Sequence, residues 1–171
     1  CYNESEIKIA VTKALSASKR STFLVERYME CDDVGVYYTF QDGICSTSLV
    51  YDRYTTDEQQ GVSRVCLGGT YPSKHIDTFL NKTDKNLKKM FNALGVKNGV
   101  LMLSAFFENG EFYFYDPGFR LQGEAPNLFL DYFHAYDQRE QLITFALTGS
   151  MGEKKAYELD DPFLNGKYAS T

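Results

Sequence analysis

The stretch from Gly99 to Gly123 constrains the fold of this chain more than any other, because it is typical of two strands joined by a tight turn. Its two runs, GVLMLSAFF and EFYFYDPGFRLQG, are rich in aromatic and branched side chains, which favour pleated strands. Glu108-Asn109-Gly110 joins them, and Asn and Gly tolerate the positive φ angles of a hairpin turn. The sequence therefore predicts an antiparallel pair of strands here.

The second of these runs ends in one acid and one base, Asp116 and Arg120, beside Gly118 and Gly123. Glycine lets the backbone approach a ligand closely, so this strand end could cradle a metal-bound phosphate. An ordinary salt bridge between the two side chains is the alternative, and the spacing taken alone favours it.

Composition excludes several classes of function. The 171 residues suit one domain, and a hydrophobic content of 43% indicates a real core. A net charge of −5, with no block of Lys or Arg, argues against nucleic-acid binding. No apolar run is long enough to span a membrane. The four cysteines show no C-x-x-C spacing, so we expect reduced thiols in a cytoplasmic protein and no zinc site.

Three segments carry apolar residues at helical spacing: Asn3–Ala17, Thr83–Leu94 and Asp137–Thr148. Asn3 and Asp137 are favourable N-caps, each followed three residues later by a glutamate that can complete a capping box. Gly95 and Gly149 suit the left-handed residue that ends a helix.

Three more segments are predicted to be strands: Thr22–Met29, Val34–Phe40 and Ile44–Tyr51. Gln41-Asp42-Gly43 joins the last two as a second hairpin. The polar stretch Asp52–Lys82 lacks periodicity and is predicted to be a mobile loop that contacts substrate or ATP. Four of its basic residues could contact phosphate or an anionic substrate: Arg53, Arg64, Lys74 and His75. For any one of them the alternative, a solvated loop with scattered charge, is favoured. This order of predicted elements indicates an α+β domain over residues 1–150, with a mainly antiparallel sheet flanked by helices, and a polar tail at 151–171.

A second group of candidate site residues surrounds the first predicted strand and the turn after it. Glu26 and Asp33 flank this turn and could face one another across a crevice. The backbone of Tyr28 and Met29 could then meet a planar heterocycle, while a carboxylate accepts hydrogen bonds from a ribose diol. The alternative is an ordinary acidic turn, which the spacing alone favours.

Together and in this order, the two groups resemble the ATP-grasp superfamily, most closely its carbamoyl-phosphate-synthase-like and carboxylate–amine-ligase-like branch. The matching stretches are CYNESEIKIAVTKALSASKRSTFLVERYMECDDVGV and GVLMLSAFFENGEFYFYDPGFRLQGEAPN, followed by DQREQLITFALTG. The first resembles the helix, strand and adenine-binding linker of that family, and the second resembles its metal-binding strand. The resemblance covers roughly residues 1–151 and implies the C-terminal portion of an ATP-grasp fold.

For the nucleoside, the resemblance implies that Glu26 and the backbone of Tyr28 and Met29 contact the adenine of ATP. It also implies that Asp33 binds the ribose hydroxyls.

For the phosphates, the resemblance implies that Asp116 binds Mg²⁺ and that Arg120 stabilises the transferred phosphoryl group. The sequence departs from the family pattern here. Asp116 replaces a longer glutamate, Gly118 replaces an asparagine ligand, and the further ligand position falls at or near Met102 or Ser104.

The implied activity is that of an ATP-dependent ligase, in which ATP phosphorylates a carboxylate and an amine then displaces the phosphate. ATP and Mg²⁺ are the expected cofactors, and small carboxylates and amines are the expected substrates. The ATP-binding half that precedes this part in the family is expected in a missing N-terminal part of the same protein, so we expect this chain alone to be inactive. A homodimer is a further option. The alternatives are a non-catalytic nucleotide-binding or structural relative with a degraded metal site, and an α+β binding domain without a nucleotide.

Overall fold

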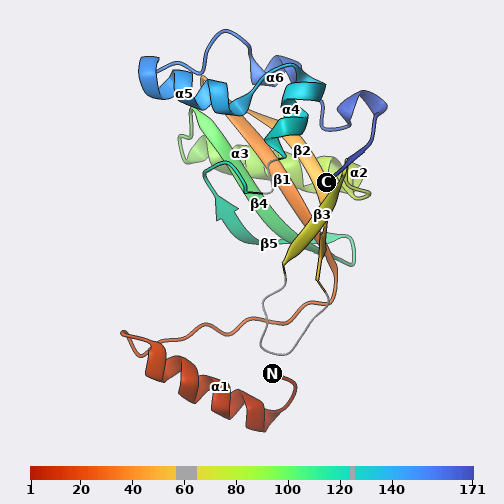
Figure 1. Cartoon of the computed structure of the whole chain (residues 1–171). Coiled ribbons are helices and arrows are strands. Elements are labelled where there is room, and N and C mark those ends of the chain that lie inside the picture. Colours follow the sequence, from red (N-terminus) through yellow and green to blue (C-terminus); the bar gives the residue numbers. More distant parts are fainter. Residues whose placement is uncertain (57–64, 124–125) are drawn as a thin grey trace. The chain divides into compact units, whose positions relative to one another are not determined.

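The computed structural model describes residues 1–56, 65–123 and 126–171, and these divide into two units. The first unit is Cys1–Glu30 and the second is Cys31–Thr171 (Figure 1). None of the described helices is long and apolar enough to cross a membrane.

The first unit contains one helix, α1 (Glu4–Ala17), which begins as predicted. The Asn3 side chain accepts a hydrogen bond from the Glu6 backbone at 3.0 Å. The Glu6 carboxylate in turn accepts one from the backbone N–H of Tyr2 at 2.8 Å. The first bond satisfies one of the backbone donors that a helix leaves unpaired at its start, and the second ties the residue before the N-cap to the first turn.

The prediction of a strand over Thr22–Met29 is wrong, because residues 22–30 have no regular secondary structure. A strand needs a neighbour to pair with its backbone groups, and no segment among the described residues pairs with this one. The apolar side chains that suggested a strand, Leu24 and Val25, are 79% and 78% exposed.

The second unit is built on a six-stranded sheet in the order β5-β4-β1-β2-β3-β6, with every neighbouring pair antiparallel. The strands are β1 (Asp32–Gln41), β2 (Ile44–Thr55), β3 (Cys66–Tyr71), β4 (Gly99–Glu108), β5 (Glu111–Gly118) and β6 (Ala169–Ser170). Both predicted hairpins are confirmed, and their turn residues have positive φ angles, at Asp42 and Gly43 and at Asn109 and Gly110. The predicted α+β class is therefore confirmed.

Helices and helical turns flank the sheet: α2 (Ile76–Phe79), the π-helical turn η1 (Leu80–Asp84), α3 (Lys85–Ala93), α4 (Asn127–His134), α5 (Gln138–Thr148), α6 (Ala156–Leu159) and the 3₁₀ turn η2 (Leu164–Gly166). The predicted helix at Thr83–Leu94 is present but belongs to a longer helical segment that begins at Ile76. The helix at Asp137–Thr148 is confirmed, with the Asp137 side chain as its N-terminal cap.

The expectation of a loop over Asp52–Lys82 is wrong for most of its described part. Strand β2 continues to Thr55, β3 pairs with it, and α2 and η1 follow. Backbone pairing between β2 and β3 supplies the order that the polar side chains did not indicate. Residues 57–64 of the expected loop lie outside the described residues. The tail after residue 150 is also ordered, since it forms α6, η2 and β6.

Each face of the sheet carries a hydrophobic core, whereas the edge strand β5 is largely exposed. Segment α2–α3 covers one face, which we call the α3 face (Figure 1). On this face Val36, Tyr38 and Phe40 pack with Phe79 and Phe91. The other face, which we call the α4 face, packs against helix α4 and turn η2. Its core is formed by Tyr37, Leu49, Tyr51, Tyr71, Met102, Leu130 and Leu164. Alternate residues of β1 therefore enter two different cores.

Two β-bulges change the register between neighbouring strands, one between β1 and β2 and one between β4 and β5. Tyr38 pairs with Thr47 but Tyr37 pairs with Leu49, so Ser48 is an extra residue in β2. In the same way, Tyr115 is an extra residue in β5. In an unbroken strand, side chains alternate between the two faces. The extra residue of a bulge shifts this alternation by one, so the residues beyond it point to the opposite face.

Candidate functional site

Arg53 forms the centre of a polar cluster on the α4 face, and the bulge in β2 places it directly opposite Asp33. Its Nη1 lies 3.3 Å from each carboxylate oxygen of Asp33. The same nitrogen lies 3.0 Å from the Tyr115 hydroxyl and 3.4 Å from Ser104 Oγ. We call Asp33, Arg53, Ser104 and Tyr115 the Arg53 cluster; it joins β1, β2, β4 and β5.

The charged pair in this cluster is largely shielded from water, since the Asp33 and Arg53 side chains are each 14% exposed. The pair reaches solvent through a pocket at the end of β1 and β2. That pocket is lined by Cys31, Asp32, Asp33, Asp52, Arg53, Tyr54, Thr55 and Lys74. A charged ligand that entered there would meet a fixed ion pair.

Tyr115 completes the cluster as a hydrogen-bond donor. Its hydroxyl lies 3.1 and 3.2 Å from the two Asp33 oxygens, and its ring stacks on Phe106 at 4.3 Å between centroids. Burial, followed by the charge of Asp33, raises the pKa of Tyr115 to about 12. At neutral pH the hydroxyl is therefore protonated and can hold the Asp33 carboxylate in place.

The other two acids that line the opening are occupied by structural contacts. The Asp32 carboxylate lies 2.9 Å from Lys74 Nζ and 2.7 Å from His75 Nε2. Burial opposes ionisation of Asp32, but the hydrogen bonds and charges of these two partners lower its pKa. Asp52 accepts hydrogen bonds from the Ser73 hydroxyl at 2.6 Å and from the Lys74 backbone at 3.1 Å. Both acids anchor the segment that leads into α2.

Asp116 lies next to the Arg53 cluster, because the bulge in β5 places it opposite Ser104. Its side chain is exposed. Among the residues that the structure describes, Asp116 and Arg120 form no ion pair, and Arg120 Nη1 donates to the Leu121 carbonyl at 3.0 Å instead. The strand-end salt bridge that the sequence left open is thus not formed.

The segment that carries Arg120 is held against the α4 face by Gln122. The Gln122 backbone N–H donates to the Tyr37 hydroxyl at 2.5 Å, and its side-chain oxygen accepts from the Tyr51 hydroxyl at 2.6 Å. Both tyrosines are buried on the α4 face. This anchoring keeps Arg120, which is exposed, at the same side of the sheet as Asp33 and Asp116.

The fit of these residues to magnesium is limited. Within the described parts of the chain, no three His, Cys, Asp or Glu side chains are grouped so that they could hold a metal ion. One carboxylate suffices when nucleotide phosphates supply further oxygen ligands, and Asp116 can serve in that way. Ser104, the residue paired with Asp116 on the neighbouring strand, lies beside the Arg53 guanidinium. The residues therefore fit one magnesium ion at Asp116 and no second ion at Ser104.

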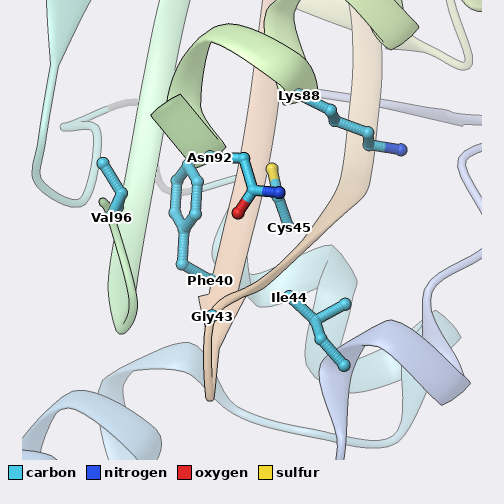
Figure 2. A pocket seen from close by; sticks show the side chains of 7 residues that line it. All are labelled: Phe40, Gly43, Ile44, Cys45, Lys88, Asn92 and Val96. Atoms are coloured by element: carbon cyan, nitrogen blue, oxygen red, sulfur yellow. The ribbon is translucent and has the colours of Figure 1, made fainter. Parts of the chain in front are cut away.

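A second pocket lies on the α3 face, between α3 and the turn of the β1–β2 hairpin (Figure 2). It is lined by Phe40, Gly43, Ile44, Cys45, Lys88, Asn92 and Val96. Burial raises the pKa of Cys45 to about 12, so its thiol is protonated and a poor nucleophile. The Lys88 ammonium forms an ion pair with Asp84 at 2.8 Å. None of the residues predicted from the sequence lines this pocket.

The structure brings together only some of the predicted site residues. Asp33 and Asp116 lie at the same face, linked through Ser104 and Arg53. Glu26, Tyr28 and Met29 belong to the first unit, so their approach to a nucleotide stays a prediction. The sequence indicates Arg53 only as one of several basic residues of the expected loop that could contact phosphate, and it does not pair Arg53 with Asp33. It does not single out Tyr115, whose only signal is that it precedes Asp116.

Comparison with known proteins identifies solved structures that share this architecture. No protein-family model and no curated protein matches the chain. Solved structures do match. Phosphoribosylglycinamide synthetase from Anaerococcus prevotii superposes with a TM-score of 0.67 over 87% of this chain at 17% identity. Biotin carboxylase from Campylobacter jejuni, in complex with β,γ-ATP, gives 0.70 over 93% at 18% identity. The chain has the C-terminal part of an ATP-grasp fold.

A third neighbour, L-amino acid ligase from Bacillus licheniformis, gives a TM-score of 0.66 over 85% of this chain at 14% identity. The chain covers 37%, 35% and 35% of these three ATP-grasp structures, in the order given. Identities this low establish the fold only. The fold predicted from the resemblance is therefore confirmed, and the activity has to be argued from the residues.

Proposed function

We propose that this chain is the C-terminal, nucleotide-binding part of an ATP-dependent ligase that activates a carboxylate as an acyl-phosphate for attack by an amine. The observation that carries the proposal is the register of the sheet. Two bulges set the register in which Asp33, Arg53, Ser104 and Asp116 share one face. Asp33 and Arg53 also line a pocket at the end of β1 and β2. The ATP-grasp fold supports ATP as the nucleotide.

In this proposal Asp33 accepts hydrogen bonds from the ribose hydroxyls. An ionised carboxylate offers about four lone-pair sites, so Asp33 can bind hydroxyls while it keeps Arg53 and Tyr115 as partners. These two residues act by positioning Asp33. The adenine is assigned to Glu26 and to the backbone of Tyr28 and Met29.

The phosphates are assigned to the β4–β5 side of the site. Asp116 would hold a magnesium ion carried by ATP, which when bound offsets phosphate charge. Arg120 would leave the Leu121 carbonyl and donate to the transferred phosphoryl group, since a guanidinium matches phosphate oxygens in geometry and charge.

The proposed reaction has two steps. An oxygen of the substrate carboxylate attacks the γ-phosphorus of ATP, the bond to the bridging oxygen breaks, and ADP leaves. The amine then attacks the acyl carbon of the acyl-phosphate, inorganic phosphate leaves with the bonding electron pair, and the amine loses a proton. Positioning and charge neutralisation by the protein supply the catalysis.

The remaining assignments also belong to this proposal. The substrates are a small carboxylate and a small amine, as in the carbamoyl-phosphate-synthase-like branch. The rest of the ATP site is assigned to another part of the same protein, because the chain covers about a third of the ATP-grasp structures that it matches. A role for residues 52–82 in selecting the acceptor, a homodimer and a cytoplasmic location stay predictions.

A second candidate function is a non-catalytic nucleotide-binding relative. It is favoured by one observation, namely that Asp116 has Ser104 rather than a second carboxylate opposite it. The two candidates differ in turnover. A ligase releases phosphate from ATP when its carboxylate and amine are supplied, whereas the non-catalytic relative binds ATP without releasing phosphate.

Calorimetry of the full-length protein with ATP and MgCl₂ tests the shared claim. We expect saturable ATP binding that Asp116→Ala weakens in the presence of Mg²⁺. Glu111→Ala is the matched control, because it removes an exposed carboxylate from the other end of β5. Failure of the wild-type protein to bind ATP would overturn the proposed function.

A further inference from the structure

We propose that the Arg53 guanidinium takes the place of a divalent cation on the Ser104 side of the site, so that nucleotide phosphates bind there without requiring a metal ion. This inference rests on the proposed function, since it concerns how the same site holds ATP.

The first step of the argument is the position of Arg53. Ser104 is paired with Asp116 on β5 and with Gly35 on β1. It therefore lies between β5, which carries Asp116, and β1, which carries Asp33. Directly paired side chains of neighbouring strands lie about 5 Å apart at Cβ. Arg53 Nη1 lies 3.4 Å from Ser104 Oγ. The positive charge of Arg53 is therefore next to Ser104, the residue that is paired with Asp116.

The second step is charge. A divalent cation at Ser104 would be repelled by the adjacent guanidinium, and the serine hydroxyl is a weak ligand compared with a carboxylate. Arginine remains protonated in proteins, so the guanidinium keeps its charge at every physiological pH, and Asp33 offsets that charge in part. The position therefore disfavours a metal ion and suits an anionic oxygen.

The third step is that Arg53 is held in place before a ligand arrives. Asp33 and Tyr115 fix its Nη1 from two other strands, and its side chain is 14% exposed. A fixed guanidinium loses little conformational freedom when it binds a phosphate. Asp33 balances its charge in the absence of ligand, so the cluster is stable without an anion.

The test compares ATP binding by the full-length protein in MgCl₂ and in EDTA. For the wild-type protein we expect dissociation constants that differ by less than about tenfold between the two conditions. For Arg53→Met, which keeps the length of the side chain and removes its charge, we expect binding in EDTA to weaken by about tenfold or more.

Two further variants separate binding from folding. Asp33→Asn combined with Arg53→Met removes both charges, so no uncompensated charge remains in the cluster; we expect this double variant to fold and to lose binding in EDTA. Lys88→Met is the matched control, because it removes a partly buried cation from an ion pair on the α3 face. We expect it to bind ATP as the wild-type protein does.

The outcomes distinguish the two claims. Binding that requires Mg²⁺ and is unaffected by Arg53→Met overturns this inference and leaves the proposed function standing. Absence of ATP binding in both conditions overturns the proposed function and this inference with it. Binding in EDTA that Arg53→Met abolishes supports both.

Discussion

The Asp33 and Arg53 side chains are each 14% exposed and contact one another from neighbouring strands. Each charge is therefore compensated mainly by its partner and only slightly by water. An ion pair that is shielded from water is costly to break from one side only, because the remaining charge stays buried without compensation. This makes the pair a sensitive point for both the stability and the chemistry of the site.

We expect Asp33→Ala to lower the free energy of unfolding by about 1–3 kcal/mol, since it leaves the Arg53 guanidinium without its carboxylate. Urea unfolding measures this cost. In a double-mutant cycle with Arg53→Ala, the double variant should be less destabilised than the sum of the two single variants. Strict additivity would show that the two side chains do not interact.

Tyr115 gives the cluster a dependence on alkaline pH. Its pKa is raised from the ordinary value of 10.0 to about 12, so the folded state binds this proton more tightly than the unfolded state. The resulting stabilisation is fully present below pH 10 and is lost as the pH rises toward 12. Unfolding by urea at a series of pH values should show this loss in the wild-type protein and a shallower one in Tyr115→Phe.

At the scale of secondary structure, two bulges decide which residues reach the site. In an unbroken hairpin with the observed turn, Asp52 would be opposite Asp33 and Tyr115 opposite Ser104. The sequence predicts both hairpins from their turn residues, but neither Ser48 nor Tyr115 carries a signal that marks an extra residue. The strands of the two hairpins could thus be predicted, whereas the registers that place Arg53 and Asp116 could not.

Gly35 on β1 leaves room for the ring of Tyr51, whose hydroxyl holds the loop that carries Arg120 through Gln122. A Cβ atom added at Gly35 would lie 2.2 Å from the ring of Tyr51, which is buried and stacks on Tyr71. We expect Gly35→Ala to displace this ring, to break the Tyr51–Gln122 hydrogen bond and to destabilise the protein by about 1–3 kcal/mol.

Hydrogen exchange measures the effect on the loop, and residues 119–123 should exchange faster in Gly35→Ala. Tyr51→Phe is the control, since it removes only the hydroxyl and should loosen the loop without the packing cost. Unchanged exchange in Gly35→Ala would contradict the role assigned to Tyr51.

At the scale of the second unit, the C-terminal segment is joined to the sheet by a buried polar network. The Asp160 side chain is 2% exposed and accepts hydrogen bonds from Ser46, from Ser48 at 2.8 Å and from Tyr136 at 2.6 Å. The sequence predicted only a polar tail here. A carboxylate that is far in sequence from its partners gives no local pattern, so this network could not be predicted.

We expect Asp160→Ala to destabilise the protein by about 3–5 kcal/mol, because it leaves several buried hydroxyls without an acceptor. Burial, followed by the charge of Asp160, raises the pKa of Tyr136, so the pKa of this tyrosine should fall in the variant. Urea unfolding measures the stability, and Glu158→Ala, which removes an exposed acid from α6, is the control. A cost equal to that of the control would contradict the network.

The measurement that tests the account most directly is a crystal structure of the full-length protein with a non-hydrolysable ATP analogue. We expect the ribose at Asp33 and the phosphates on the α4 face, in contact with Arg53 and near Asp116. An analogue bound in the pocket beneath α3, or a phosphate chain that reaches neither Arg53 nor Asp116, would contradict the assignment of the site.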